Sequence, residues 1–146
     1  MKRLVMFLPG SILFLLSLAG CQKNVKVDYT DPQAVVEYQQ NVICNIIARD
    51  MTSKRAYKKL NPVSSSKRQE KYPKKAYIEL LSQYERYQEV DMIMVDYDLG
   101  EPIYDGDEIA NILVIQHYKN GLTMERKICL IKEKDRWLIE EDKIIR

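Results

Sequence analysis

The chain has 146 residues, of which 46% are hydrophobic and 30% charged, and its formal net charge is +2. This length and composition fit one small domain with its own core. If Lys2 and Arg3 leave with an N-terminal leader, 21 of the 23 basic residues remain against 21 acidic ones, so the composition does not favour a nucleic-acid partner.

The first 21 residues have the form of an export signal that ends at a cysteine. Lys2 and Arg3 precede an apolar run over residues 4–20, which is at the lower limit of the roughly 20 residues that a transmembrane helix needs. The run closes with LAGC at 18–21 and turns polar at once. This ending resembles the lipobox of bacterial lipoproteins, whose cysteine receives a diacylglyceryl group.

The resemblance implies that residues 1–20 are a lipoprotein signal peptide and that Cys21 is the lipidation site. Two acyl chains on one residue are sufficient for stable membrane anchoring. We therefore expect a protein on the extracytoplasmic face of the cell membrane, with a lipidated cysteine and tether at 21–30 and a domain at 31–146. The alternative is an ordinary signal peptide or membrane helix with an incidental cysteine.

Helical spacing predicts three helices in the first half of the domain. Asp31-Pro32 is typical of a helix start, with a capping carboxylate followed by proline in the first turn. The expected helices cover about 32–50, 52–60 and 73–88, with a loop at 61–73. The apolar face of the first helix comprises Val35, Val36, Gln39, Val42, Ile43, Ile46, Ile47 and Met51.

From residue 93 on, the apolar period becomes two, as in strands. Residues 109–118 are apolar on both faces, which predicts a central strand. Asn120-Gly121 and Lys134-Asp135 predict tight hairpin turns. The expected strands cover 93–99, 109–118, 122–133 and 136–145, with Val95, Tyr97 and Leu99 on the buried face of the first. Helices followed by a four-stranded antiparallel sheet indicate an α+β fold.

This order of elements resembles the NTF2-like superfamily, in which a curved antiparallel sheet wraps around helices to form a cone. Two stretches carry the resemblance, DPQAVVEYQQNVICNIIARD at 31–50 and GDEIANILVIQHYKNGLTMERKICLIKEKDRWLIEE at 106–141. The resemblance implies N-terminal helices packed on a curved four-stranded sheet over residues 31–146. The chain departs from the family at 61–72, where no short strand is visible, so an incomplete cone is expected.

Two cysteines remain if Cys21 is lipidated. Cys44 and Cys129 either form a disulfide, as extracytoplasmic cysteines can, or are buried thiols. The chain has no CxxC motif and His117 is its only histidine, so we expect no metal site and no cofactor. The acidic segment at 89–108 lacks the loop spacing of an EF-hand and is interpreted as the exposed face of a strand.

The NTF2-like resemblance raises the question of catalysis, because enzymes of that family place an acid or base at the mouth of an apolar pocket. His117 lies on the face of a predicted strand and Tyr97 on a neighbouring strand, so the two could act as a relay. The alternative is a half-exposed histidine at a strand end. We assign no catalytic residue and keep His117 and Tyr97 as candidates.

Residues 54–75 carry nine Lys and Arg residues against a single acid, Glu70. Such a segment suits contact with anionic lipid headgroups, and the alternative is a solvated helix and loop. The residues expected to contact an anionic surface are Lys54, Arg55, Lys58, Lys59, Lys67 and Arg68.

The sequence favours a non-catalytic binding or scaffold module at the cell surface. Its partners would be the membrane, through the lipid anchor, and a second copy of the chain or an envelope protein. Met92 and Met94 are expected on the exposed sheet face that such a partner would cover. The alternative is a small-molecule-binding or isomerase-type site inside the cone.

Overall fold

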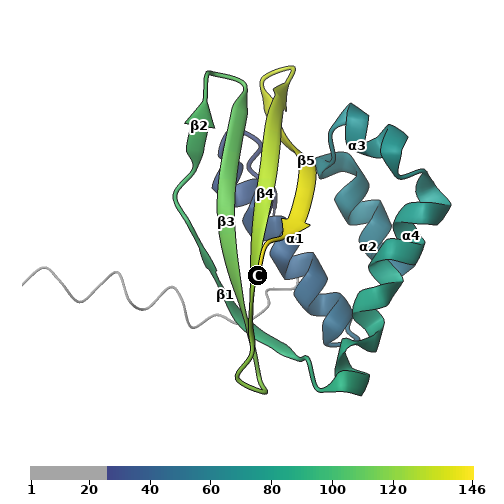
Figure 1. Cartoon of the computed structure of the whole chain (residues 1–146). Helices are drawn as coiled ribbons and strands as arrows, with labels where there is room; N and C mark the ends of the chain where they lie inside the picture. The colour runs from purple at the N-terminus through teal and green to yellow at the C-terminus, as the bar shows by residue number, and fades with distance from the viewer. Residues whose placement is uncertain (1–25) are drawn as a thin grey trace, which may run out of the picture.

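A computed structural model describes residues 26–146, in which helices pack against one face and one edge of an antiparallel sheet (Figure 1). The predicted signal peptide and Cys21 lie outside the described residues. The helices are α1 (Pro32–Ile47), α2 (Ser53–Leu60), α3 (Ser66–Lys71) and α4 (Lys74–Ser82), with the 3-10 helices η1 (Asn61–Val63) and η2 (Gln83–Val90). The strands are β1 (Met94–Leu99), β2 (Ile103–Asp105), β3 (Ile109–Tyr118), β4 (Thr123–Glu133) and β5 (Arg136–Ile144).

The helix starts lie where the capping residues predict them. The Asp31 side chain accepts a hydrogen bond from the Gln33 backbone N–H at 2.9 Å, with Pro32 in the first turn. Thr52 caps α2 by accepting from the Arg55 N–H at 3.3 Å. Each contact satisfies a backbone donor that the helix itself leaves unpaired.

The sheet has the central strand that its apolar pattern predicts. Strand β3 pairs with β1 and β2 along one side and with β4 along the other, in the order β1-β3-β4-β5. Both predicted tight turns are present, with positive φ at Gly121 (86°), Lys134 (50°) and Asp135 (61°). Every strand pair is antiparallel.

The expected count of four strands is wrong, and so is the simple loop at 61–73. The three-residue strand β2 pairs with the start of β3 and makes the sheet five-stranded. The segment at 61–73 contains η1 and α3, and between them Ser64 forms a parallel bridge with Ile139 of β5. That bridge ties the basic segment to the sheet edge, where no pairing was expected.

A β-bulge overturns the predicted facing of the start of the first strand, whereas Tyr97 and Leu99 pack against the core as predicted. The register of β1 against β3 shifts between Met94 and Asp96, which turns the start of the strand over. Met94 is consequently buried, with 4% of its surface exposed, whereas Val95 is 49% exposed. Met94 therefore does not lie on an outer partner face. The third predicted helix also changes form, because it continues as 3-10 helix after Ser82.

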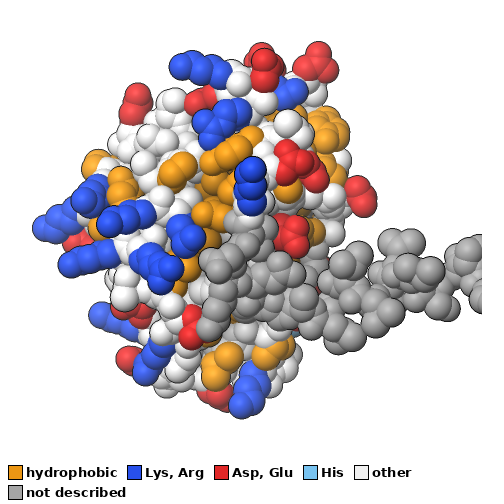
Figure 2. Space-filling view, turned by 180° about the vertical axis from the view of Figure 1, so that it is seen from behind, with side chains coloured by type: hydrophobic (Ala, Val, Ile, Leu, Met, Phe, Trp, Pro, Cys, Tyr) orange, Lys and Arg blue, Asp and Glu red, His pale blue; other side chains and the backbone are white. Residues whose placement is uncertain are grey.

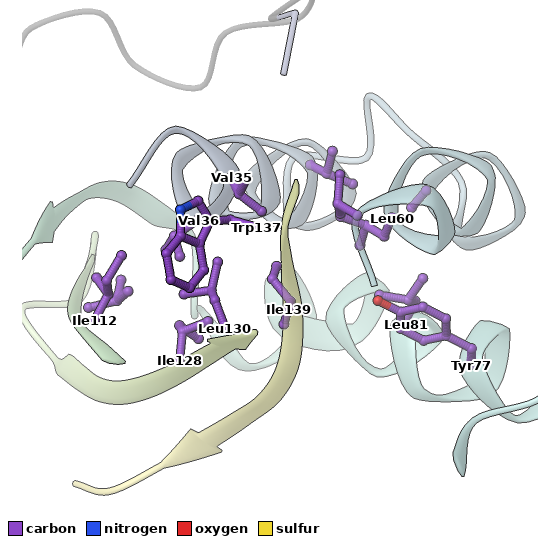
Figure 3. Close-up of a cluster of buried hydrophobic side chains, with 14 of the residues drawn as sticks. Val35, Val36, Leu60, Tyr77, Leu81, Ile112, Ile128, Leu130, Trp137 and Ile139 are labelled. Carbon is purple, nitrogen blue, oxygen red and sulfur yellow. The ribbon is translucent and has the colours of Figure 1, made fainter. Parts of the chain in front are cut away.

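The main core lies between α1 and the inner face of the sheet and continues to α2 and α4. In Figure 3, Val35 and Val36 of α1 lie beside Trp137, while Leu60 of α2 lies near Tyr77 and Leu81 of α4. The sheet side of this core includes Ile112, Ile128, Leu130 and Ile139. Burial of these side chains holds the helices against the sheet at roughly 25 cal/mol per Å² of apolar surface.

Candidate functional site

A chain of buried polar side chains crosses the otherwise apolar interior. The Tyr118 hydroxyl donates to Gln116 Oε1 at 2.9 Å, and Gln116 Nε2 donates to Gln40 Oε1 at 2.6 Å. Gln40 Nε2 donates to Gln39 Oε1 at 3.2 Å, and Gln39 Nε2 donates to Asp142 Oδ2 at 2.9 Å. Burial raises the pKa of Tyr118 to about 12, so its hydroxyl remains a donor. The chain thus connects β3, α1 and β5 through satisfied hydrogen bonds.

The chain ends in a buried ion pair between β4 and β5. Arg126 Nε lies 2.8 Å from Asp142 Oδ1, and the two side chains are 7% and 5% exposed. A register shift in β5 opposite Cys129 and Leu130 makes this possible. Because of this shift, Ile139 pairs with Leu130 and Asp142 pairs with Ile128, and both partners on β4 face inward. Bulges often re-aim a side chain in this way.

The Asp142 carboxylate forms part of the wall of a pocket between the helices and the β4–β5 side of the sheet. The pocket has a volume of about 100 Å³. Its polar lining consists of Gln39, Arg68, Arg126, Asp142 and the tyrosines at 72, 77 and 84, and its apolar lining of Ile43, Leu60, Leu80 and Leu81. A few fixed polar groups in an apolar wall are what a small-ligand site requires.

Arg68 of α3 is the exceptional member of this lining. Only 6% of its surface is exposed, and its Nε has no hydrogen-bond partner among the described residues. Its guanidinium carbon lies 5.3 Å from the ring centre of Tyr72 and 5.4 Å from that of Tyr77. The sequence placed Arg68 among the residues expected to contact an anionic surface. Arg68 is instead buried, because the Ser64 bridge docks α3 against β5.

Tyr84 lines the same pocket and remains protonated. Burial raises the pKa of its hydroxyl, an effect that Arg126 opposes and Asp142 reinforces. A neutral phenol offers both a hydrogen-bond donor and an acceptor. Tyr84 falls within the predicted helix at 73–88, and nothing in its local sequence marks it as a pocket residue.

A larger depression of about 460 Å³ lies between the α1–α2 connection and η2. Its rim includes the ion pair of Arg49 with Glu89 at 3.9 Å, whose side chains are 56% and 65% exposed. Ion pairs this exposed contribute little energy and are screened by salt. We therefore place the candidate site at the smaller pocket, where the charged groups are buried.

The two candidates for a catalytic relay lie on opposite faces of the sheet. His117 points away from the helices, and its Nε2 lies 2.7 Å from Asp98 Oδ2. Tyr97 points inward, where its hydroxyl donates to Asn41 Oδ1 at 3.1 Å and burial raises its pKa. Successive residues of a strand alternate between its faces, and Tyr97 pairs with Gln116 rather than with His117. The structure does not bring the pair together.

Replacing His117 with alanine is expected to change the free energy of unfolding by less than about 1 kcal/mol. The His117 and Asp98 side chains are 38% and 68% exposed, and exposed pairs are worth about 0–1 kcal/mol. Urea denaturation of His117→Ala, with Asp98→Ala as the matched control, measures this. A loss above about 2 kcal/mol for His117→Ala alone would show that the histidine does more than the surface pair indicates.

The alternative disulfide between Cys44 and Cys129 does not form, because the structure holds Cys129 as a free thiol. Cys44 is buried on α1, inside the sheet. Cys129 pairs with Asn111 and Glu141 between the inward-facing Ile128 and Leu130, so it points to the outer face. Within residues 26–146, no group of three or more His, Cys, Asp or Glu side chains is placed to hold a metal ion.

The other residues predicted to contact an anionic surface lie on the outer side of the helices. Lys54, Arg55 and Lys58 are exposed on α2, and Lys67 is exposed on α3, where it lies 3.5 Å from Glu140. Lys59 is half-buried. Figure 2 shows Lys and Arg side chains gathered on the helical side of the molecule. No helix within residues 26–146 is long and apolar enough to cross a membrane.

Comparisons with known proteins inform the fold only. No protein-family model matches the sequence, and no curated protein matches it. The solution structure of a SEC-C motif containing protein from Rhodopseudomonas palustris is similar, with a TM-score of 0.54, 9% identity and 82% of each chain covered. A crystal structure of an NTF2-like candidate transpeptidase from Campylobacter jejuni has a TM-score of 0.49 and 14% identity, over 65% of this chain and 91% of that one. At 9% identity, the first similarity supports the arrangement of helices on an antiparallel sheet and nothing about activity.

Proposed function

We propose that the chain is a lipid-anchored extracytoplasmic lipoprotein with an NTF2-like domain that binds a small molecule in the pocket beside Arg68 and Asp142. The LAGC sequence before a polar tether supports the anchor. The observation that carries the binding function is the pocket itself, whose wall holds three charged side chains away from solvent. Burying charged groups lowers the stability of a small domain unless they are compensated. If these side chains only filled the core, apolar residues of similar size would give a stability at least as high.

The pocket is suited to binding rather than to proton transfer. Asp142 is the carboxylate of its lining, and its two oxygens already accept from Arg126 and Gln39. A general base must reach a proton of the substrate, whereas these two hydrogen bonds fix the carboxylate in the pocket wall. Asp142 is instead held as a fixed acceptor that orients its two donors.

The volume of the pocket limits its ligand. Sites for drug-sized molecules usually have volumes of about 300–1,000 Å³, whereas this one offers about 100 Å³. That space holds several water molecules or an organic group of a few heavy atoms. The ligand is therefore a small metabolite or the polar end of a larger one.

Native mass spectrometry of the full lipoprotein, extracted from its own membrane in mild detergent, tests this function. We expect a small adduct that survives gentle activation and that is lost in Leu80→Trp, which fills the pocket from its apolar wall. Leu122→Trp is the matched control, because Leu122 is 56% exposed at a hairpin. An adduct that persists in Leu80→Trp, or is absent from the unmodified protein, contradicts the pocket function.

The outer face of the sheet supports a second candidate function, that of a scaffold for another protein. Ile103, Ile109 and Leu113 are 73%, 36% and 41% exposed. Ile103 pairs with Asn111, which lies between Ile109 and Leu113 on the same face of β3. Contiguous exposed apolar residues are typical of interaction surfaces. The same spectra separate the two candidates, because a scaffold would carry a protein-sized added mass instead of a small adduct.

A further inference from the structure

Arg68 carries a charge that the described part of the protein does not neutralise. Its Nε has no partner within residues 26–146, and its Nη1 reaches the Glu140 carbonyl oxygen only at 3.5 Å. The Glu140 carboxylate lies instead near Lys67, at 3.5 Å. Buried guanidinium groups normally meet a carboxylate or a full set of acceptors, so the environment of Arg68 is short of one anionic acceptor.

The two tyrosine rings near Arg68 do not supply that acceptor. The rings of Tyr72 and Tyr77 attract the cation through their faces. The N–H groups of a guanidinium, however, lie in its own plane and form their strongest bonds to a carboxylate or a similar two-oxygen group. The rings help to bury Arg68, which lines the pocket, but they offer no in-plane acceptor to its N–H groups.

The charges around the pocket define the ligand that would complete it. Arg126 and Asp142 neutralise each other at 2.8 Å, which leaves the single positive charge of Arg68 in the lining. One positive charge matches a monoanion better than a phosphate dianion. The protonated Tyr84 hydroxyl adds a neutral donor to the same lining.

We propose that the pocket binds the carboxylate group of a small organic acid, with the Arg68 guanidinium as its counter-charge. This inference rests on the proposed function and specifies its ligand class. The volume of about 100 Å³ accommodates a carboxylate with a few further atoms. Arg68 selects the charge of the ligand, and the apolar wall of Ile43, Leu60, Leu80 and Leu81 limits its size.

Titration of the ¹⁵N-labelled lipoprotein in detergent micelles with sodium acetate tests the proposal. The shifts are followed by NMR at the Arg68 Nε–H and, in all variants, at the backbone amides of the pocket residues Leu80 and Tyr84. Acetamide serves as the neutral probe of nearly equal shape, and sodium chloride keeps the ionic strength constant. A ligand of four heavy atoms has limited affinity, so we expect a saturable shift at about millimolar acetate. We expect acetamide to bind about tenfold more weakly or worse.

Three variants locate the charge that acetate recognises. Arg68→Gln should weaken acetate binding about tenfold or more, and Arg68→Lys, which lacks the planar fork, should also weaken it. Arg55→Gln is the matched control, since it removes an exposed charge on α2 and should leave binding unchanged. If Arg68→Gln does not fold, the comparison of acetate with acetamide on the unmodified protein still decides.

The outcomes distinguish this inference from the proposed function. Equal binding of acetamide and acetate overturns the role of Arg68 and leaves a pocket that binds neutral molecules. An equal loss of acetate binding in Arg55→Gln also overturns it, because the effect of charge would then not be specific to the pocket. Absence of saturable binding by acetate also overturns it, and the mass-spectrometric adduct then reports on the pocket function independently. A saturable acetate response that depends on Arg68 supports both.

Discussion

Replacing Asp142 with alanine is expected to lower the free energy of unfolding by about 3–5 kcal/mol, because it leaves a buried charge without its partner. The Arg126 side chain is 7% exposed, and Asp142 is its ion-pair partner at 2.8 Å. The same substitution removes the acceptor of the Gln39 amide at 2.9 Å. Urea denaturation, with the slope compared to that of the unmodified protein, measures the loss.

Glu141→Ala is the matched control for Asp142→Ala. It removes a neighbouring carboxylate whose side chain is 40% exposed and lies 2.8 Å from Lys143. Exposed pairs of this kind contribute about 0–1 kcal/mol. Replacing both charges, as Arg126→Met with Asp142→Leu, should recover much of the loss, because no unpaired charge remains. Similar losses for Asp142→Ala and Glu141→Ala would show that the buried pair does not hold β5 in place.

Replacing Cys21 with serine is expected to abolish lipid attachment completely. The proposed anchor is a thioether, and its formation needs a sulfur nucleophile that a serine hydroxyl cannot replace at neutral pH. Labelling with radioactive palmitate, together with the intact mass of the membrane-extracted protein, measures the change. The unmodified chain should begin at Cys21 and carry the added lipid, whereas Cys21→Ser should keep residues 1–20 and carry none.

Cys129→Ser provides the control for the labelling experiment. Cys129 is a free, half-buried thiol, and burial raises its pKa, so it is a poor competitor for modification. Its replacement should leave the palmitate label at the level of the unmodified protein. An unlabelled native protein, or one cut at another residue, would be incompatible with the lipoprotein assignment.

The sequence predicted those elements that have strong local signals. Asp31-Pro32 located the start of α1, and Asn120-Gly121 and Lys134-Asp135 located the two hairpins, because only a few conformations suit these residues. Strand β2 escaped prediction because it has three residues and depends on its pairing with β3. The facing of Met94 was wrong because a bulge, which has no clear sequence signal, inverts the alternation.

The candidate site was less predictable than the fold, because its members are distant in sequence. Helical spacing placed Gln39 on the buried face of α1. Its partner Asp142 lies in a run of charged residues at the end of the last strand, where the sequence gives no sign that one of them is buried. Arg68 belongs to a run of basic residues in which burial of one member is unexpected. Only the docking of α3 on β5, through Ser64 and Ile139, separates Arg68 from its exposed neighbours.

The hydrogen bond between Gln39 and Asp142 joins residues 103 positions apart, on the first helix and the last strand. The pocket therefore needs the first helix and the last strand to be brought together, a contact that local structure alone cannot form. A chain that ended before Asp142 would keep the sequences of all its helices and lose one wall of the pocket. Ligand occupancy would thus report that the chain has been made to its end and folded throughout, which local helix content cannot do.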